Sequence, residues 1–295
     1  MLESVRKAPH VPELVIVDDA QLSPAVVRDL RSRASAAGVG SFRYLRNPRG
    51  SGLYDSRLVG IAQAKGAVLF FLDDDVTIAP EYLATLSRLY ERYPRAAGIG
   101  GVDQLETPRS WPVAVLQRAF LVDSGRPGRF SPSGFVGSVR RWPAQTTEFE
   151  SEYLAGCNMS FRREVLTGLG PVPWLGGYSL GEDLYISHVA SQAGELIVSP
   201  ALRVWHDRSR VSRDALARVA RARVGNTFQI LRLRGGSPIN VVALLWTVTW
   251  LVLKDTLRLV RLSQVPGYAQ GVADVLRALW SGEGPALARG RAPRG

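Results

Sequence analysis

Two clusters of carboxylates follow two predicted strands of the sequence. These are Asp18-Asp19, after the apolar run 13–17, and Asp73-Asp74-Asp75, after the run 67–72. Because the carboxyl ends of parallel strands meet at one edge of a sheet, both clusters are expected to face one site. Adjacent carboxylates repel one another, and a divalent cation that prefers oxygen ligands, such as Mg²⁺ or Mn²⁺, removes that repulsion. The alternative is an acidic turn that complements the helix predicted to begin at Pro80.

A third acidic pair and one histidine occupy comparable positions. Glu182 and Asp183 open a predicted helix over 182–193, and His206 ends a predicted strand over 202–206. The acidic pair is also compatible with ordinary N-terminal complementation of the helix dipole. A single histidine is compatible with a purely structural role, but its place at a strand end near acidic clusters favours a metal ligand.

The elements that hold these residues alternate between strand and helix. Strands are predicted at 13–17, 42–45, 67–72, 97–102, 195–199 and 202–206, and helices at 24–37, 54–65, 80–93, 162–169 and 182–193. Residues 103–150, rich in Pro, Gly, Arg and Trp, are predicted to form loops. The order of the first hundred residues predicts an α/β fold with a single Rossmann-like, mostly parallel sheet flanked by helices.

The composition excludes several classes of protein. With 46% hydrophobic and 21% charged residues the chain is not disordered, and one Cys in 295 residues excludes a disulfide scaffold. No run of eighteen or more apolar residues is present, which excludes a polytopic membrane protein. The first ten residues contain no apolar stretch typical of a secretory signal.

The net charge of +11 lies entirely in the last third of the chain. Residues 1–202 hold 21 basic and 21 acidic side chains, whereas residues 203–295 hold 16 basic and 5 acidic ones. The charge therefore separates a neutral body from a basic appendage, and we expect a catalytic domain over 1–206 and a helical C-terminal region over 207–295. The Arg residues have no aromatic-basic platform beside them, so nucleic acid is not the expected partner.

The basic appendage also contains an apolar helix. Residues 239–253 are mostly apolar, and fifteen helical residues span roughly 22 Å, short of a hydrocarbon core about 30 Å thick. At the end of this run and beyond it, three basic side chains share one face of the predicted helix (Lys254, Arg258 and Arg261). Three apolar side chains share the neighbouring face (Leu253, Leu257 and Val260). This pattern predicts a surface-bound or re-entrant membrane helix over 239–262, anchored at the interface by Trp246 and Trp250. The alternative is a helix packed on the catalytic body or on another subunit.

Several motifs together resemble glycosyltransferase family 2 with the A-type nucleotide-sugar-binding fold, over about residues 1–235. In chain order they are LVIVDDA, RLVGIAQAKGAVLFFLDDDVTIAPEYL, CNMSFRREVL, GEDLYISHVASQAG and the strand that ends at His206. The resemblance assigns nucleotide-sugar binding to Asp18, Asp19, Arg57, Asp73 and Asp74, and metal binding to Asp73, Asp75 and His206. It makes Asp183 the catalytic base, supported by Glu182.

The resemblance implies an inverting, metal-dependent transferase that uses Mg²⁺ or Mn²⁺. The metal would neutralise the departing diphosphate, and one carboxylate would deprotonate the attacking hydroxyl. The expected donor is a nucleotide diphosphate hexose or deoxyhexose, and the expected acceptor is a lipid-linked or cell-surface glycan in cell wall or polysaccharide biosynthesis. The basic appendage places this activity at an anionic membrane surface, on the cytoplasmic face of the cell membrane. The processive motif Gln-x-x-Arg-Trp is only partly matched at 229–233, which favours single transfers.

The sequence departs from the family at its N-terminus. Family members begin with a strand of the type VVIPTYN and a helix that ends in an LESV-like sequence, whereas here that sequence stands at residues 2–5. The first strand is therefore expected to be missing from this sequence, and we expect either that the true start lies upstream or that the chain binds nucleotide poorly. Two alternatives remain open: a metal-dependent phosphohydrolase that uses the Asp cluster, and a catalytically impaired, membrane-bound nucleotide-binding protein.

Overall fold

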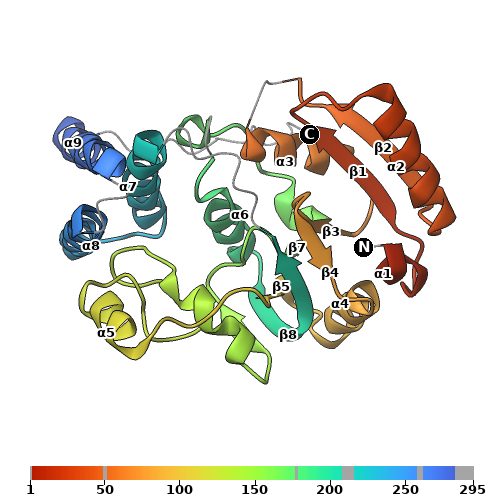
Figure 1. The fold of residues 1–295 in the computed structure, drawn as a ribbon. Helices are drawn as coiled ribbons and strands as arrows, with labels where there is room; N and C mark the ends of the chain where they lie inside the picture. Colours follow the sequence, from red (N-terminus) through yellow and green to blue (C-terminus); the bar gives the residue numbers. More distant parts are fainter. Residues whose placement is uncertain (1, 49–51, 177–178, 208–215, 258–261, 283–295) are drawn as a thin grey trace, which may run out of the picture.

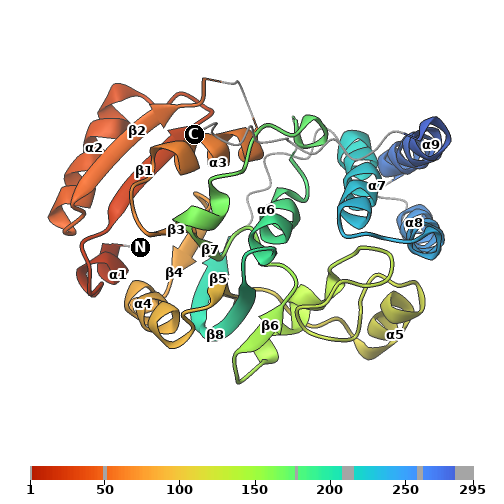
Figure 2. The ribbon, with the colours of Figure 1, turned by 180° about the vertical axis from the view of Figure 1, so that it is seen from behind.

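The computed structural model describes residues 2–48, 52–176, 179–207, 216–257 and 262–282. Figure 1 shows three regions side by side: an N-terminal β-α-β unit, a central sheet with its helices, and a group of C-terminal helices. Figure 2 shows the same order from behind. The central region therefore separates the N-terminal strands from the C-terminal helices.

The N-terminal region is built on two parallel strands. Its elements are α1 (Leu2–Arg6), β1 (Glu13–Asp18), α2 (Pro24–Ala36) and β2 (Ser41–Arg46), and α3 (Leu53–Gln63) follows them along β1. β1 and β2 pair with Asp18 opposite Arg46. As the sequence predicts, α2 begins after Ser23, whose hydroxyl accepts a hydrogen bond from the amide of Val26 at 3.4 Å.

The central sheet has the strand order β3-β7-β5-β8-β4, and β6 pairs with β8. These strands are β3 (Val68–Phe71), β4 (Val76–Ile78), β5 (Ala96–Asp103), β6 (Phe149–Ser151), β7 (Met159–Arg162) and β8 (Glu195–His206). α4 (Tyr82–Arg92) packs on one face, and α3 and α6 (Glu182–Ser191) pack on the other. Along β8, Leu196 and Val198 contact the α6 side and Ile197 contacts the α4 side, as expected for a strand buried on both faces.

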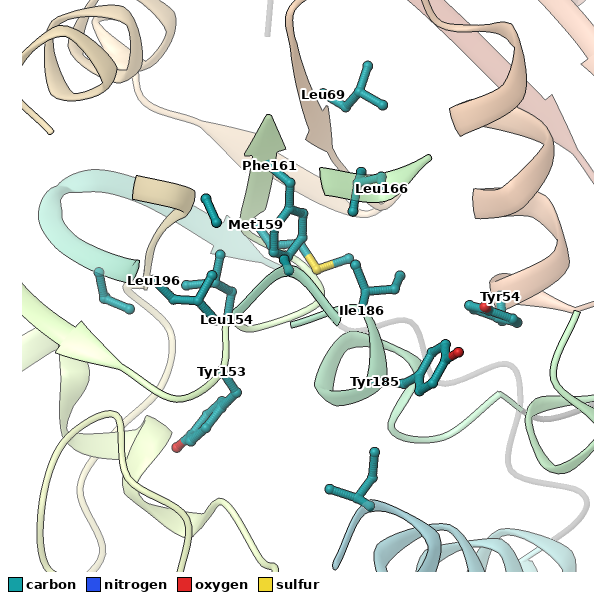
Figure 3. Close-up of a cluster of buried hydrophobic side chains, with 14 of the residues drawn as sticks. Tyr54, Leu69, Tyr153, Leu154, Met159, Phe161, Leu166, Tyr185, Ile186 and Leu196 are labelled. Carbon is teal, nitrogen blue, oxygen red and sulfur yellow. The ribbon is translucent and has the colours of Figure 1, made fainter. Parts of the chain in front are cut away.

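The larger hydrophobic cluster lies between the sheet and α6. In Figure 3, Met159 and Phe161 of β7 lie between Leu196 of β8 and Ile186 of α6, and Tyr185 of α6 lies beside Tyr54 of α3. All of these side chains are at most 3% exposed. This cluster fixes α6 against the sheet and thereby fixes the position of the acidic pair at the start of α6.

Glycines allow β5 to lie very close to its neighbours. A Cβ atom built on Gly101 would lie 1.9 Å from the carbonyl oxygen of Leu202, and one on Gly98 would lie 2.6 Å from the ring of Phe161. Because a backbone oxygen cannot move aside as a flexible side chain can, only glycine fits at position 101. β5 is therefore held at the distance that brings its last residue, Asp103, next to the end of β8.

The expected α/β class, with a central sheet flanked by helices, is confirmed. The sheet is more mixed than expected, because only β1–β2 and β5–β8 pair in parallel and the described strands form two sheets instead of one. The short antiparallel strands β4, β6 and β7 have three or four residues each, too few for a clear periodic signal. The predicted strands 195–199 and 202–206 are one strand, β8, with an irregular register around Pro200.

Two predictions of local structure were wrong. Residues 103–150 are not all loop, because they contain α5 (Trp111–Ala119) and a 3₁₀ turn over Gly137–Ala144. The predicted helix over 162–169 is instead the end of β7 followed by a 3₁₀ turn over Arg163–Leu166. In both places the segments are short, so tertiary packing decided the local conformation.

The C-terminal region consists of three packed helices. They are α7 (Leu216–Leu233), α8 (Pro238–Leu257) and α9 (Val265–Ser281), which share a hydrophobic cluster. α7 is attached to the body by Arg234, which follows it and bonds Glu152 at 3.0 Å, and by Asn226, whose amide bonds the carbonyl oxygen of Leu180 at 2.8 Å. The expected boundary at 206/207 stays a prediction. Arg258, Val260 and Arg261 lie outside the described residues.

α8 is the one helix in the described segments that is long and apolar enough to cross a membrane by length and composition. Within its most apolar stretch, 33% of the residues are buried inside the protein. The indole of Trp246 and the hydroxyl of Thr247 bond the carbonyl oxygens of Ala119 and Phe120, at the end of α5. α8 therefore packs on the body along part of its surface.

Candidate active site

The three predicted metal ligands come together at the ends of β3 and β8. The ligand atoms of Asp73, Asp75 and His206 all lie within 4.8 Å of one another, and His206 Nε2 is 3.1 Å from Asp75 Oδ1. The short strand β4 creates this proximity, because Val76 pairs with His206 across the antiparallel ladder. Two carboxylate oxygens and one imidazole nitrogen form a donor set that fits Mg²⁺ or Mn²⁺. Asp74, between the two ligands, is exposed to solvent.

The second acidic pair opens α6 at the same edge. Gly181 adopts a left-handed conformation, with φ +89°, and turns the chain so that both following carboxylates point across to other elements. Asp183 accepts hydrogen bonds from the amides of Gly156, at 3.1 Å, and Leu184, at 2.9 Å. Glu182 is 6% exposed and accepts a bond from Arg57 Nη1 at 2.7 Å. The pair therefore does more than complement the dipole of its own helix.

Arg57, on α3, joins the metal group to the acidic pair. Its guanidinium donates to Asp73 Oδ1 at 3.1 Å, to Glu182 Oε1 at 2.7 Å and to the carbonyl oxygen of Gly156 at 2.9 Å. The side chain is 5% exposed. The resemblance assigns Arg57 to nucleotide-sugar binding, which stays a prediction, and the structure places its guanidinium in a buried junction among three chain segments.

Burial raises the pKa values of both carboxyls in the acidic pair. For Asp183 burial is the main cause, opposed by the charge of Arg57 and by the two backbone amides. Burial is also the largest cause of the raised pKa of Glu182, and the negative charge of Asp183 raises this pKa further. The positive charge of Arg57 lowers it. A carboxylate with a raised pKa is a stronger base, which suits the removal of a proton from a hydroxyl group.

Asp18 and Asp19, at the end of β1, each accept several hydrogen bonds. Asp18 accepts from the amides of Ala20 and Leu22 and from the hydroxyl of Tyr44. Asp19 accepts from the amide of Gly52, the hydroxyl of Ser56 and the side-chain amide of Asn47, at 2.7–3.0 Å. Burial raises the pKa of each carboxyl, but these donors outweigh it and the net shift is downward.

Asp19 is connected to the rest of the site through α3. Asp19 bonds Ser56, and the next residue is Arg57. Neither aspartate belongs to a group of metal-ligating atoms in the described part of the chain. A chain of contacts links Asp19 through α3 to Asp73, and the role of Asp18 and Asp19 in nucleotide-sugar binding stays a prediction.

Sequence reasoning missed two residues next to the metal group. Asp103 and Cys157 form a second donor group with His206, and these three ligand atoms also lie within 4.8 Å of one another. Asp103 ends β5 as Asp18 ends β1, so the strand-end rule could have found it. Cys157 gave no such signal, because only the pairing of β7 with β5 brings the turn before β7 to the site.

A surface hollow of about 400 Å³ lies at the opposite end of β5 and β8. It is lined by Arg95, Arg162, Glu164 and Glu195, among others. These residues lie near the first residues of the two strands, whereas ligands in open α/β sheets bind beyond the last residues. The donor groups at the other end are therefore the better candidate site.

Comparison with known proteins agrees with this geometry. The model of glycosyl transferase family 2 matches residues 1–167, which is more than half of the chain. Among solved structures, S. aureus TarS 1–349 has a TM-score of 0.51 at 14% identity, over 94% of this chain and 75% of its own. The A-type glycosyltransferase fold is therefore confirmed.

Two further solved structures contain bound small molecules and Mn²⁺. The mannosyltransferase PcManGT from Pyrobaculum calidifontis, in complex with GDP-Man and Mn²⁺, has a TM-score of 0.49 at 16% identity, over 96% of this chain and 83% of its own. GalNAc-T7 with UDP, GalNAc and Mn²⁺ also has a TM-score of 0.49, at 21% identity over 77% of this chain. The chain spans 43% of GalNAc-T7. Because the family model matches more than half of its length, the chain belongs to glycosyltransferase family 2.

Proposed function

We propose that this protein is an inverting, metal-dependent glycosyltransferase that moves a hexose or deoxyhexose from a nucleotide diphosphate to a glycan hydroxyl. The observation that carries the proposal is the junction at Arg57, which joins a metal-ligand group to the carboxylate pair at the start of α6 in one site. Transfer from a diphosphate needs both parts, because negative charge develops on the leaving group while the acceptor loses a proton.

Asp73, Asp75 and His206 would hold Mg²⁺ or Mn²⁺. The bound ion supplies Lewis-acid stabilisation of the diphosphate. The described contacts favour Asp73 and Asp75 over Asp74, which is exposed beside them and remains available for the nucleotide sugar. Asp18 and Asp19 are proposed to contact the nucleotide from the end of β1, where Asp19 also fixes the start of α3.

Asp183 is the proposed base. It is half-buried, and the amides of Gly156 and Leu184 fix the orientation of its carboxylate. The bond between the acceptor oxygen and the anomeric carbon forms as the bond to the diphosphate oxygen breaks, and Asp183 takes the acceptor proton. One displacement of this kind inverts the anomeric configuration. Glu182 is almost fully buried and held by Arg57, so it is a positioning residue for Asp183.

The test is a screen of nucleotide sugars with Mg²⁺ or Mn²⁺, read out as release of the nucleotide. We expect at least one donor to be consumed by the wild type, with loss of turnover in Asp75→Ala and on addition of a chelator. Asp29→Asn is the matched control, because Asp29 lies in an exposed ion pair with Arg33 on α2. Release of phosphate from simple esters, without turnover of any nucleotide sugar, would instead support a phosphohydrolase.

The outer face of α8 supports a membrane-bound acceptor. An apolar stripe runs along it, with side chains 46–73% exposed: Ile239, Val242, Trp246, Leu253 and Leu257. Successive positions in this stripe are three, four or seven residues apart, which is close to one or two helical turns of 3.6 residues. They therefore share one face of the α-helix. The opposite face, including Leu244, Val248 and Leu251, is buried against the other C-terminal helices. An outer face of this kind is expected to have a partner.

A lipid surface fits this stripe. Its first part, Ile239, Val242 and Trp246, lines an apolar hollow of about 240 Å³ together with Leu121 and Pro132 of the body. The charge of +11 in residues 203–295 would attract anionic headgroups, at about 1 kcal/mol for each well-placed cation. Because its inner face is already buried, α8 is proposed to lie on the cytoplasmic face of the membrane and present the site to a lipid-linked glycan.

Vesicle sedimentation tests this placement. The wild type is expected to bind phosphatidylcholine vesicles that contain phosphatidylglycerol more strongly than vesicles of phosphatidylcholine alone, and high salt should weaken the binding. The double substitution Ile239→Ser and Leu257→Ser should reduce binding, whereas Val26→Ser, an exposed position on α2, should not. Equal binding by the double variant and the control would contradict a lipid-facing stripe, and salt-resistant self-association would indicate a second copy instead.

A further inference from the structure

His206 belongs to two groups of metal-ligating atoms. One is the oxygen-rich group with Asp73 and Asp75, and the other contains Asp103 and Cys157. The second group offers a carboxylate oxygen, a thiol sulfur and an imidazole nitrogen from the end of β5, the turn before β7 and the end of β8. Both groups depend on the same imidazole ring.

The contacts of His206 place its two ring nitrogens in different surroundings. Nε2 lies 3.1 Å from Asp75 Oδ1, in the first group. Nδ1 is buried and has no hydrogen-bond partner among the described residues. The backbone amide of His206 donates to Asp103 Oδ1 at 3.2 Å. Nδ1 is the ring nitrogen nearer the backbone, whose amide contacts Asp103, and we therefore take it as the donor of the second group.

The second group matches a different class of cation. Thiolate, imidazole and carboxylate are the ligands of Zn²⁺, whereas Mg²⁺ prefers oxygen ligands. Zinc bonds of about 2.0–2.3 Å place tetrahedral ligand atoms about 3.5 Å apart, so donor atoms within 4.8 Å of one another would have to approach by at most about 1.3 Å. Asp103 is 7% exposed, and the amides of Leu105 and His206 hold its Oδ1 in place. Asp75, at Nε2, would be the carboxylate partner that commonly orients a zinc-bound histidine.

We propose that Asp103, Cys157 and His206 form a second site, for Zn²⁺ or a similarly thiophilic cation, and that its occupation inhibits glycosyl transfer. Binding releases the thiol proton of Cys157 to solvent. A neutral imidazole bound through Nδ1 carries its proton on Nε2, where it donates to Asp75. The same ring then has no lone pair for an ion held by Asp73 and Asp75. The inhibition rests on the proposed function, whereas the binding site does not.

Cobalt binding tests the site without any turnover. Co²⁺ added to the whole chain is expected to produce a thiolate-to-cobalt charge-transfer absorption in the near ultraviolet, which Zn²⁺ removes by displacement. Cys157→Ser should abolish the absorption, and Asp103→Asn should weaken Co²⁺ binding about tenfold while it retains the absorption. Thermal unfolding in the presence of a chelator checks that each variant is folded. Absence of the absorption in the wild type would overturn the site.

Inhibition by Zn²⁺ tests whether the two metal sites compete for the imidazole of His206. With a donor that is turned over in Mn²⁺, Zn²⁺ should inhibit the wild type, and Cys157→Ser should require about tenfold more Zn²⁺ for the same fractional loss of its own zinc-free rate. Equal inhibition of the two proteins would overturn the competition even if cobalt binds. If no donor is turned over, the proposed function fails, but the cobalt absorption still decides whether the second site exists.

Discussion

The carboxylates at the end of β1 and those at the start of α6 differ in how the fold treats the same chemical group. Asp18 is partly open to solvent and accepts several hydrogen bonds, and its pKa is lowered. Glu182 is paired with Arg57, yet its pKa is raised, because it is almost fully buried beside Asp183. Burial therefore outweighs a neighbouring cation at α6, whereas hydrogen bonds outweigh burial at β1. The first environment favours a charged binding group, and the second favours a base.

The largest difference between the two regions should appear in turnover. Asp183→Asn is expected to lower kcat by about 10²–10⁴-fold, the usual contribution of a general base. Asp18→Asn should change KM for the donor more than kcat, because Asp18 is proposed to bind and not to transfer protons. Steady-state kinetics of both variants with one donor make the comparison. A larger loss of kcat in Asp18→Asn than in Asp183→Asn would reverse the proposed roles.

The next effect concerns stability at the buried junction. Arg57→Gln leaves Asp73 and Glu182 without their shared cation, and we expect the free energy of unfolding to fall by about 3 kcal/mol or more. Arg33→Gln is the matched control, because the ion pair of Arg33 with Asp29 is more than half exposed and should contribute less than about 1 kcal/mol. Urea unfolding measures both. Equal losses would mean that Arg57 is not held in a desolvated junction.

A smaller effect should follow from a shift of the acidic pair. A Cβ atom on Gly156 would lie 3.3 Å from Asp183 Cβ and 3.3 Å from Glu182 Oε1, so Gly156→Ala should displace the pair by a few tenths of an ångström. We expect kcat to fall about tenfold, because small misplacements of reacting groups are costly. Gly168→Ala, where a Cβ would meet nothing within 4 Å, should keep the wild-type kcat. Wild-type kcat in Gly156→Ala would show that the pair tolerates displacement.

The smallest effect is expected at β1, as a change in acid sensitivity. A carboxyl whose pKa is lowered in the folded state contributes stability above its unfolded pKa, and that contribution is lost as the pH falls through the folded value. Tyr44→Phe removes one donor to Asp18, so its thermal unfolding temperature should fall less between neutral and acidic pH than that of the wild type. The contribution of Glu182 to stability depends on pH with the opposite sign, because its raised pKa makes the folded state bind a proton more readily than the unfolded state does. A larger fall of the unfolding temperature at acidic pH in Tyr44→Phe than in the wild type would contradict the lowered pKa of Asp18.

The parts of the fold with strong local signals could be predicted. Ser23-Pro24 marked the start of α2, and the apolar run 67–72 marked β3. The proximity of Asp73, Asp75 and His206 followed from the rule on strand ends, although the rule assumed parallel strands and the contact depends on the antiparallel pair of β4 with β8. The rule succeeded because both elements end at the same edge of the sheet.

Other parts of the site could not be predicted, because they depend on contacts between distant segments. Arg57 is buried by partners 16, 99 and 125 residues away, and no local pattern distinguishes it from an exposed helix arginine. Cys157 reaches His206 only through the pairing of β5 with β7 and β8. α5 was missed because nine residues with Pro112 in the first turn carry a weak periodic signal.

The dependence of kcat/KM on pH tests the central claim most directly. If Asp183 supplies the base, activity must fall as the pH is lowered through its raised pKa, and this acid limb must lie above the usual pKa of an aspartate. The account predicts such a limb in the wild type and its absence from the residual activity of Asp183→Asn. A limb at or below the usual pKa of an aspartate, or the same limb in Asp183→Asn, would contradict a base tuned by burial.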